Sequence, residues 1–158
     1  MRLLYFLLSL CIGIQVMAQT NPIIPKPVSY QSLATAGVKL DASSKIVGPA
    51  KYQAQLQYLQ ASLKQQTGLQ LSINKQVPKS GSYLLIQDDP TQIDKAEMYL
   101  LESKGNEIKI TVKDIRGLVN AIQTLLQICP LQKSSSFEVP AVAIKDYPRF
   151  EYRGMHLD

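Results

Sequence analysis

Residues 97–130, EMYLLESKGNEIKITVKDIRGLVNAIQTLLQICP, decide the fold because a strand pair and a helix follow one another directly. Two extended arms, 97–103 and 107–113, flank the turn-forming Lys-Gly-Asn at 104–106. Apolar and polar residues alternate in the second arm, which is typical of a strand with one buried face. The stretch therefore predicts a β-hairpin on a hydrophobic core, with the buried positions at Ile108, Ile110 and Val112.

The hairpin is followed by an amphipathic helix. Asp114 is a good N-cap residue, so we expect the helix to begin there. Pro130 ends it, because proline cannot continue a helix. The wide apolar stripe between these two residues comprises Ile115, Leu118, Val119, Ile122, Leu125 and Leu126.

A second helix is predicted upstream of the hairpin. Its apolar residues recur at the spacing i, i+4, i+7 and i+11, so they share one face, and Gly68 suits the position just past its end. The apolar face consists of Tyr52, Leu56, Leu59 and Leu63, and the opposite face carries Gln53, Gln57, Gln60 and Lys64.

The remaining segments read as short strands after a proline-rich, extended lead-in at 21–30. With hairpin-like neighbours and only two helices, this order predicts an α+β fold. We expect a two-layer sandwich: a mostly antiparallel sheet with both helices on one face. The further strands are expected at 37–40, 45–47, 69–73, 83–87 and 137–144.

The first residues are predicted to be a signal peptide. Arg2 precedes an apolar run at 3–16, and small residues around Ala18 suit signal peptidase. A lipoprotein signal would use Cys11, but Leu10 is bulky where lipidation needs a small residue. We therefore expect residues 1–18 to be removed and the protein to be exported to the periplasm, the cell surface or the medium.

Charge and cysteine content exclude several classes of function. Loss of Arg2 lowers the net charge from +5 to +4, and the lysines are spread singly, so nucleic acid is not an expected partner. Cys129 would be the only cysteine left, which leaves no internal disulfide. We interpret it as a small buried apolar group in preference to a reactive thiol.

Before residue 145 the sequence contains no motif that we interpret as an active site. His156 is the only histidine, so histidine-based zinc sites lack ligands. Asp88-Asp89-Pro90, with Asp94 nearby, is open to two interpretations, a calcium loop or carboxylate pair and a solvated turn, and we favour the turn. No cofactor or metal is expected.

The last residues carry more chemistry. In DYPRFEYRGMHLD at 146–158, Arg153 precedes Gly154 at the start of an alternating segment. The planar guanidinium of such an arginine can bind two neighbouring hydroxyls or a carboxylate, or else form a structural ion pair. The alternating end reads as a strand without a partner, so we expect this chain to be the front part of a longer protein.

This terminal segment resembles the start of the catalytic barrel of glycoside hydrolase family 20, the β-N-acetylhexosaminidases, with its pattern Asp-x-Pro-Arg-Phe-x-x-Arg-Gly. Residues 99–101 and 108–110 resemble the family's strand pair, and GLVNAIQTLLQ at 117–127 resembles its helix. IIPKP at 23–27 is similar to the usual opening of the mature enzymes. One departure is Ala121, where the family helix usually carries glycine, which suggests local repacking.

The resemblance implies a division of the chain and a role for one residue. Residues 19–146 would be the non-catalytic N-terminal α+β domain, and 147–158 the truncated first strand of a (β/α)8 barrel. Arg153 matches the arginine that binds the 3- and 4-hydroxyls of the terminal sugar. Asp158 matches an aspartate that supports the barrel, and His156 receives no role.

The family removes terminal N-acetylglucosamine or N-acetylgalactosamine from glycans, with the substrate's own acetamide as nucleophile. An adjacent Asp-Glu pair assists, and this sequence contains no such dipeptide. The chain alone is therefore expected to be inactive. The alternative is a stand-alone exported α+β module, without enzymatic activity, that binds a glycan or a protein.

Overall fold

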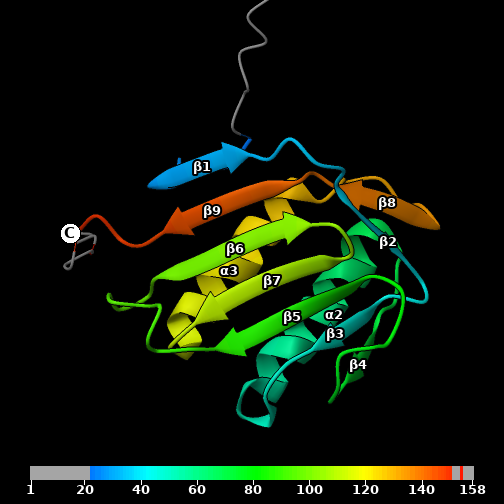
Figure 1. Cartoon of the computed structure of the whole chain (residues 1–158), viewed down its shortest axis with the longest axis horizontal. Helices are drawn as coiled ribbons and strands as arrows, with labels where there is room; N and C mark the ends of the chain where they lie inside the picture. Colours follow the sequence, from blue (N-terminus) through cyan, green and yellow to red (C-terminus); the bar gives the residue numbers. More distant parts are fainter. Residues whose placement is uncertain (1–21, 151–153, 155–158) are drawn as a thin grey trace, which may run out of the picture.

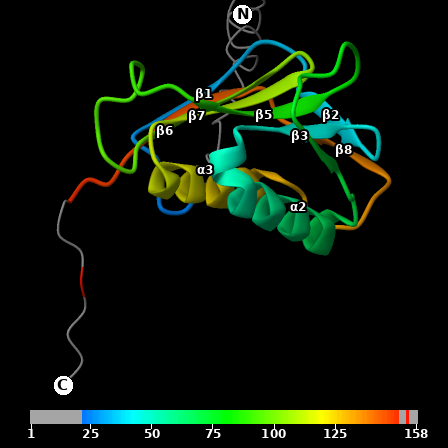
Figure 2. The same ribbon diagram turned by 90° about the horizontal axis from the view of Figure 1, so that it is seen from below.

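The computed structural model describes residues 22–150 and Gly154, so the predicted signal peptide lies outside the described residues. Within them, a seven-stranded sheet and a two-stranded sheet are accompanied by two helices, both on one face of the large sheet (Figures 1 and 2). The strands are β1 (Ser29–Ser32), β2 (Val38–Asp41), β3 (Lys45–Val47), β4 (Ser72–Asn74), β5 (Tyr83–Asp88), β6 (Tyr99–Lys104), β7 (Glu107–Val112), β8 (Ser136–Val139) and β9 (Val142–Asp146). The helices are the short 3₁₀ turn η1 (Ala50–Tyr52), α2 (Gln53–Thr67) and α3 (Ile115–Ile128).

The predicted α+β, two-layer architecture is confirmed, and the large sheet is mixed. Its strand order is β1-β9-β6-β7-β5-β3-β4. The half that contains β1, β9, β6 and β7 is antiparallel, as expected. In the other half β5 runs parallel to both β7 and β3, and β3 runs parallel to β4.

The hairpin forms as its sequence predicts. β6 and β7 pair antiparallel, from Tyr99 opposite Val112 to Lys104 opposite Glu107. Gly105 takes a φ of +61° in the turn, a conformation that glycine adopts without steric cost. The apolar positions of β7 point to the helices and are fully buried, namely Ile108, Ile110 and Val112.

The N-terminus of α3 is capped as predicted. The Asp114 carboxylate accepts a hydrogen bond from the Gly117 amide at 2.8 Å, which satisfies one free donor of the first turn. At Gly117 the helix approaches the sheet so closely that a Cβ atom would lie 2.5 Å from the Met98 carbonyl oxygen. Ala121, the departure from the family pattern, is fully buried in the core.

The second predicted helix is α2. Its residues Leu56, Leu59 and Leu63 are buried against the sheet. Gly68 ends it in the left-handed conformation with a φ of +83°, and its amide donates to the Lys64 carbonyl at 3.0 Å. This is the C-terminal cap that its sequence position predicted.

Two strand predictions were wrong. The single strand expected at 137–144 is broken at Pro140, which has no amide proton to donate to a sheet. β8 pairs with β2 in the small sheet, whereas β9 enters the large sheet between β1 and β6. β1 was expected only as extended lead-in, and it owes its place to pairing with β9.

No helix in the described part of the chain is long and apolar enough to cross a membrane.

Candidate functional site

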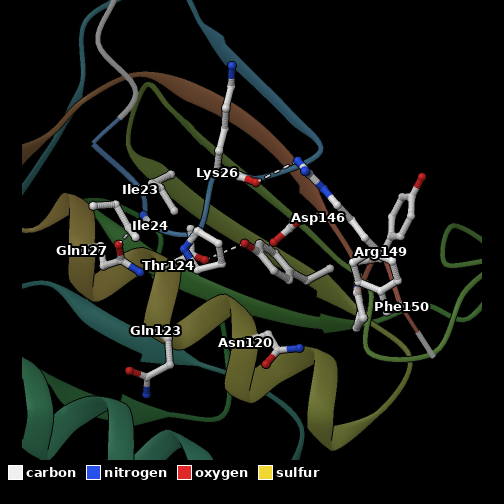
Figure 3. A pocket seen from close by; sticks show the side chains of 14 residues that line it. Ile23, Ile24, Lys26, Asn120, Gln123, Thr124, Gln127, Asp146, Arg149 and Phe150 are labelled. Carbon is white, nitrogen blue, oxygen red and sulfur yellow. Dashed lines mark hydrogen bonds between the residues drawn. The ribbon is translucent and has the colours of Figure 1, made fainter. Parts of the chain in front are cut away.

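Three segments that are far apart in the sequence enclose a hollow of about 380 Å³ (Figure 3). The first is the lead-in around Ile24, the second is the polar side of α3, and the third is the exit segment, residues 146–150, which begins at the end of β9. Figure 3 shows Asn120, Gln123 and Gln127 on α3 along one side and Asp146, Arg149 and Phe150 on another.

Hydrogen bonds tie the lead-in to both of the other segments. The Ile24 amide donates to Gln127 Oε1 on α3 at 2.8 Å. The Val28 amide donates to Asp146 Oδ1 at 3.1 Å, and Arg149 Nη2 donates to the Lys26 carbonyl at 3.2 Å. The two ends of the domain are therefore joined by side chains as well as by the β1–β9 pair.

A buried hydroxyl pair lies at this pocket. The hydroxyls of Tyr99, at the start of β6, and Thr124, on α3, are 2.5 Å apart. Burial, the main cause, raises the pKa of the Tyr99 phenol far above its ordinary value, and the nearby Asp146 carboxylate raises it further. Tyr99 therefore stays protonated at all ordinary pH values and acts as a structural hydrogen-bonding group.

The lining suits binding more than acid–base chemistry. Among the described residues that line the pocket, Asp146 is the only carboxylate, and side-chain amides form much of one wall. A glycosidase of the usual kind needs two carboxylic groups on either side of the scissile bond. The described lining thus offers hydrogen bonds and a cationic rim from Lys26 and Arg149.

The acidic residues at the end of β5 and in the turn after it are held by local hydrogen bonds. Asp88 pairs with Lys51 and also accepts from the Tyr52 hydroxyl at 3.1 Å, and the Lys51 contact is the main cause that lowers its pKa. Asp89 accepts from the side chain and amide of Thr91, which lowers its pKa as well. No group of three or more potential metal ligands occurs among the described residues.

Cys129 is buried with 4% of its surface exposed, and burial raises the pKa of its thiol to about 12. A thiol that remains protonated at neutral pH is a poor nucleophile. The geometry agrees with the interpretation of Cys129 as a small buried apolar group.

Comparison with known proteins identifies the domain. Residues 20–147 match the family model described as glycosyl hydrolase family 20, domain 2. The chain belongs to this family. It is 32% identical over 142 residues to a β-hexosaminidase of Porphyromonas gingivalis, a match that covers 86% of this chain and 18% of that protein.

Solved structures of family 20 share the fold. A family 20 β-N-acetylglucosaminidase matches with a TM-score of 0.62 and 29% identity, over 83% of this chain and 23% of that one. The exo-β-N-acetylglucosaminidase of Vibrio harveyi, solved in complex with N-acetylglucosamine, matches with a TM-score of 0.71 and 24% identity over 84% of this chain and 20% of its own. This family 20 chain thus spans less than a quarter of these relatives.

The residue expected to contact sugar is not placed by this structure. Arg153 lies outside the described residues, as do His156 and Asp158. The pocket includes residues to which we assigned no function from the sequence, chiefly Thr124 and Gln127. Their signal was present, since both are polar residues of the helix stretch that resembles the family.

Proposed function

We propose that this chain is the N-terminal supporting domain of an exported β-N-acetylhexosaminidase. The observation that carries the proposal is the match of residues 20–147 to domain 2 of family 20, together with 32% identity to a β-hexosaminidase. The domain comprises residues 19–146, and residues 147–158 begin the catalytic (β/α)8 barrel. The complete enzyme removes terminal β-linked N-acetylglucosamine or N-acetylgalactosamine from glycans.

The catalytic step belongs to the barrel. The substrate's acetamido oxygen attacks the anomeric carbon, an Asp orients the acetamide, and a neighbouring Glu protonates the leaving oxygen. Since this sequence lacks an Asp-Glu dipeptide, the 158-residue chain does not perform the reaction. Arg153 contributes to the complete site by donating to two hydroxyls of the terminal sugar.

Two products of the same reading frame test this function. The 158-residue chain should release no p-nitrophenol from p-nitrophenyl N-acetylglucosaminide, whereas the product that continues past Asp158 should hydrolyse it. In that longer product Arg153→Lys should reduce kcat/KM by about tenfold or more, because a lysine cannot bind both hydroxyls. Turnover by the pure 158-residue chain would overturn the assignment of catalysis to the barrel.

Export has its own test. The N-terminal sequence of the protein recovered outside the cytoplasm should begin at Gln19, with residues 1–18 removed. A mature protein that keeps Met1 would contradict the proposed signal peptide. A frame that stops at Asp158 and yields a stable glycan-binding product would instead favour the stand-alone module.

A further inference from the structure

The lead-in offers few backbone groups that a sheet could use. Pro22, Pro25 and Pro27 have no amide proton, so this segment cannot form the full hydrogen-bond ladder of a strand. Among the described residues, sheet pairing begins only at Ser29 in β1. The position of the lead-in before β1 must therefore be fixed by contacts of another kind.

Three side chains supply such contacts. They bond to main-chain groups of residues 24, 26 and 28, a spacing of two that suits an extended segment. Figure 3 shows the Arg149 side chain reaching the Lys26 carbonyl. One of the three partners comes from α3 and two come from the exit segment: Gln127, Asp146 and Arg149. The lead-in therefore acts as a strap between α3 and the exit segment.

A further contact holds the exit segment. The Lys95 ammonium lies 3.7 Å from the centroid of the Tyr147 ring, which is a cation–π contact. Lys95 belongs to the loop between β5 and β6, and Glu97 of this loop pairs with Arg116 on α3 at 3.4 Å. Two parts of the domain, the lead-in and this loop, therefore fix the direction in which the polypeptide leaves the sheet.

This hold limits where the next residues can lie. Arg153 follows Arg149 by four residues, and four residues in full extension span at most about 14 Å. An arginine that binds two neighbouring hydroxyls needs a defined position, because displacement of a binding group by about 1 Å can reduce the rate about hundredfold. The contacts of Arg149 therefore bear on the placement of Arg153.

We propose that Arg149 and Gln127 are positioning residues that act through the lead-in to place Arg153 at the sugar. The inference rests on the proposed function, because it takes Arg153 to donate to two hydroxyls of the terminal sugar. Arg149 fixes the exit segment on the Lys26 carbonyl, and Gln127 fixes the lead-in on α3. Neither side chain needs to touch the substrate itself.

Kinetics of the longer product test this role. Arg149→Met removes the donor but keeps an unbranched side chain, and should lower kcat/KM for p-nitrophenyl N-acetylglucosaminide about fivefold or more. Arg149→Lys keeps a donor for the carbonyl and should stay within about twofold of wild type. Lys109→Met removes a cation from the outer face of the sheet and is the control, with a change of less than about twofold.

A double-variant cycle shows whether Arg149 acts through Arg153. In an Arg153→Lys background, Arg149→Met should lower kcat/KM by less than about twofold, because the contact that it helps to place is already lost. A role in stability alone predicts the same loss in both backgrounds. Equal losses in the two backgrounds, or wild-type kinetics of Arg149→Met, would overturn the proposal.

Gln127 is tested in the same way. Gln127→Met removes the acceptor for the Ile24 amide and should lower kcat/KM in the wild-type background but not in the Arg153→Lys background. Gln127→Glu keeps an acceptor and should retain most of the activity. Wild-type kinetics of Gln127→Met would remove Gln127 from the positioning role.

Stability separates positioning from a structural role. The bond between Arg149 and the Lys26 carbonyl is exposed, so Arg149→Met should lower the urea midpoint of the 158-residue chain by about 0.5 M or less. A larger shift would overturn the positioning role in favour of a structural one. An active longer product that does not respond to these variants overturns this inference alone. A longer product without activity, or a frame that ends at Asp158, overturns the proposed function and this inference with it.

Discussion

The two faces of this domain have nearly opposite surfaces. The outer face of the sheet carries alternating charges: Glu102 lies opposite Lys109, and Lys104 opposite Glu107. Lys104 also pairs with Glu102 at 2.7 Å. The exposed side of the helices, by contrast, presents glutamines, Tyr58 and aliphatic groups. Both layers bury the same core, so the difference concerns only the surfaces that the two layers turn away from it.

A charged sheet face has a simple physical purpose. Cross-strand pairs of opposite charge contribute little energy on a surface, but they keep the sheet hydrated and limit unwanted association. The helix side lacks this protection. α2 and α3 together contain only two charged residues, Lys64 and Arg116.

The largest effect on stability is expected where α3 contacts the sheet most closely, at Gly117. Gly117→Ala places a Cβ 2.5 Å from the Met98 carbonyl oxygen, so helix and sheet must separate. We expect a loss of about 2–4 kcal/mol in the free energy of unfolding, even though alanine is the better helix former. Urea denaturation of the 158-residue chain measures it. Val119→Ala on the exposed side of α3 is the control and should change stability by about 0.5 kcal/mol or less; equal stability of both variants would contradict the close contact.

The buried hydroxyl pair should have a smaller effect. Tyr99→Phe leaves the Thr124 hydroxyl without its partner at 2.5 Å and should cost about 1–2 kcal/mol of unfolding free energy. The double variant Tyr99→Phe/Thr124→Val removes both polar groups and should recover part of the loss. Chemical denaturation of the two variants checks this, and a double variant less stable than Tyr99→Phe would argue against the pair as the cause.

The cap of α3 gives a similar but pH-dependent effect. Partial burial opposes ionisation of Asp114, but the amides of Gly117 and Glu97 outweigh it and lower its pKa. Asp114→Ala should therefore cost about 1 kcal/mol at neutral pH. The pKa of Asp114 is lower in the folded state than in the unfolded state, where it is about 4. This stabilisation is therefore fully present above the unfolded-state pKa and is lost as pH falls through the folded-state pKa.

Unfolding free energies of wild type and Asp114→Ala, measured between neutral and acid pH, should converge in acid. Asp114→Asn keeps an amide-accepting cap without a titrating group, so it serves as the control. A gap between wild type and Asp114→Ala that stays constant into strong acid would show that ionisation of Asp114 contributes nothing.

The smallest effect on stability is expected from charges added to the exposed side of the helices. Gln57→Lys/Gln65→Lys adds charge to the exposed side of α2 and should alter the stability of the 158-residue chain by about 0.5 kcal/mol or less. The low number of charges on α2 would then be unnecessary for folding of the domain itself. A loss above about 1 kcal/mol by thermal denaturation would instead mean that the helix layer needs its neutrality to fold.

Local signals explain why much of this fold could be predicted. The hairpin β6–β7 needs only a turn and alternating residues, and α3 is marked by Asp114 and its apolar stripe. The prediction of one strand at 137–144 was wrong because the apolar run around Pro140 looked continuous. Nothing in the local sequence shows that β8 and β9 join different sheets. The parallel pairing of β3 with β5 is equally invisible, since it depends on the packing of α2.

The pocket could not be predicted from the sequence. It depends on contacts such as Ile24 with Gln127 and Val28 with Asp146, which join residues more than a hundred positions apart. Polar residues such as Thr124 hinted at a site within the helix that resembles family 20. Only the fold brings that helix to both ends of the domain.

The β1–β9 pair has a consequence for how such a domain is passed between proteins. Ser29 at the start of β1 lies opposite Lys145 near the end of β9, so the polypeptide enters and leaves the sheet side by side. A longer chain can gain or lose the whole unit with hardly any change in the distance between its flanking segments. The same pairing makes the unit mechanically exposed, because tension between those flanks would open β1 from β9 one hydrogen bond at a time, like a zipper.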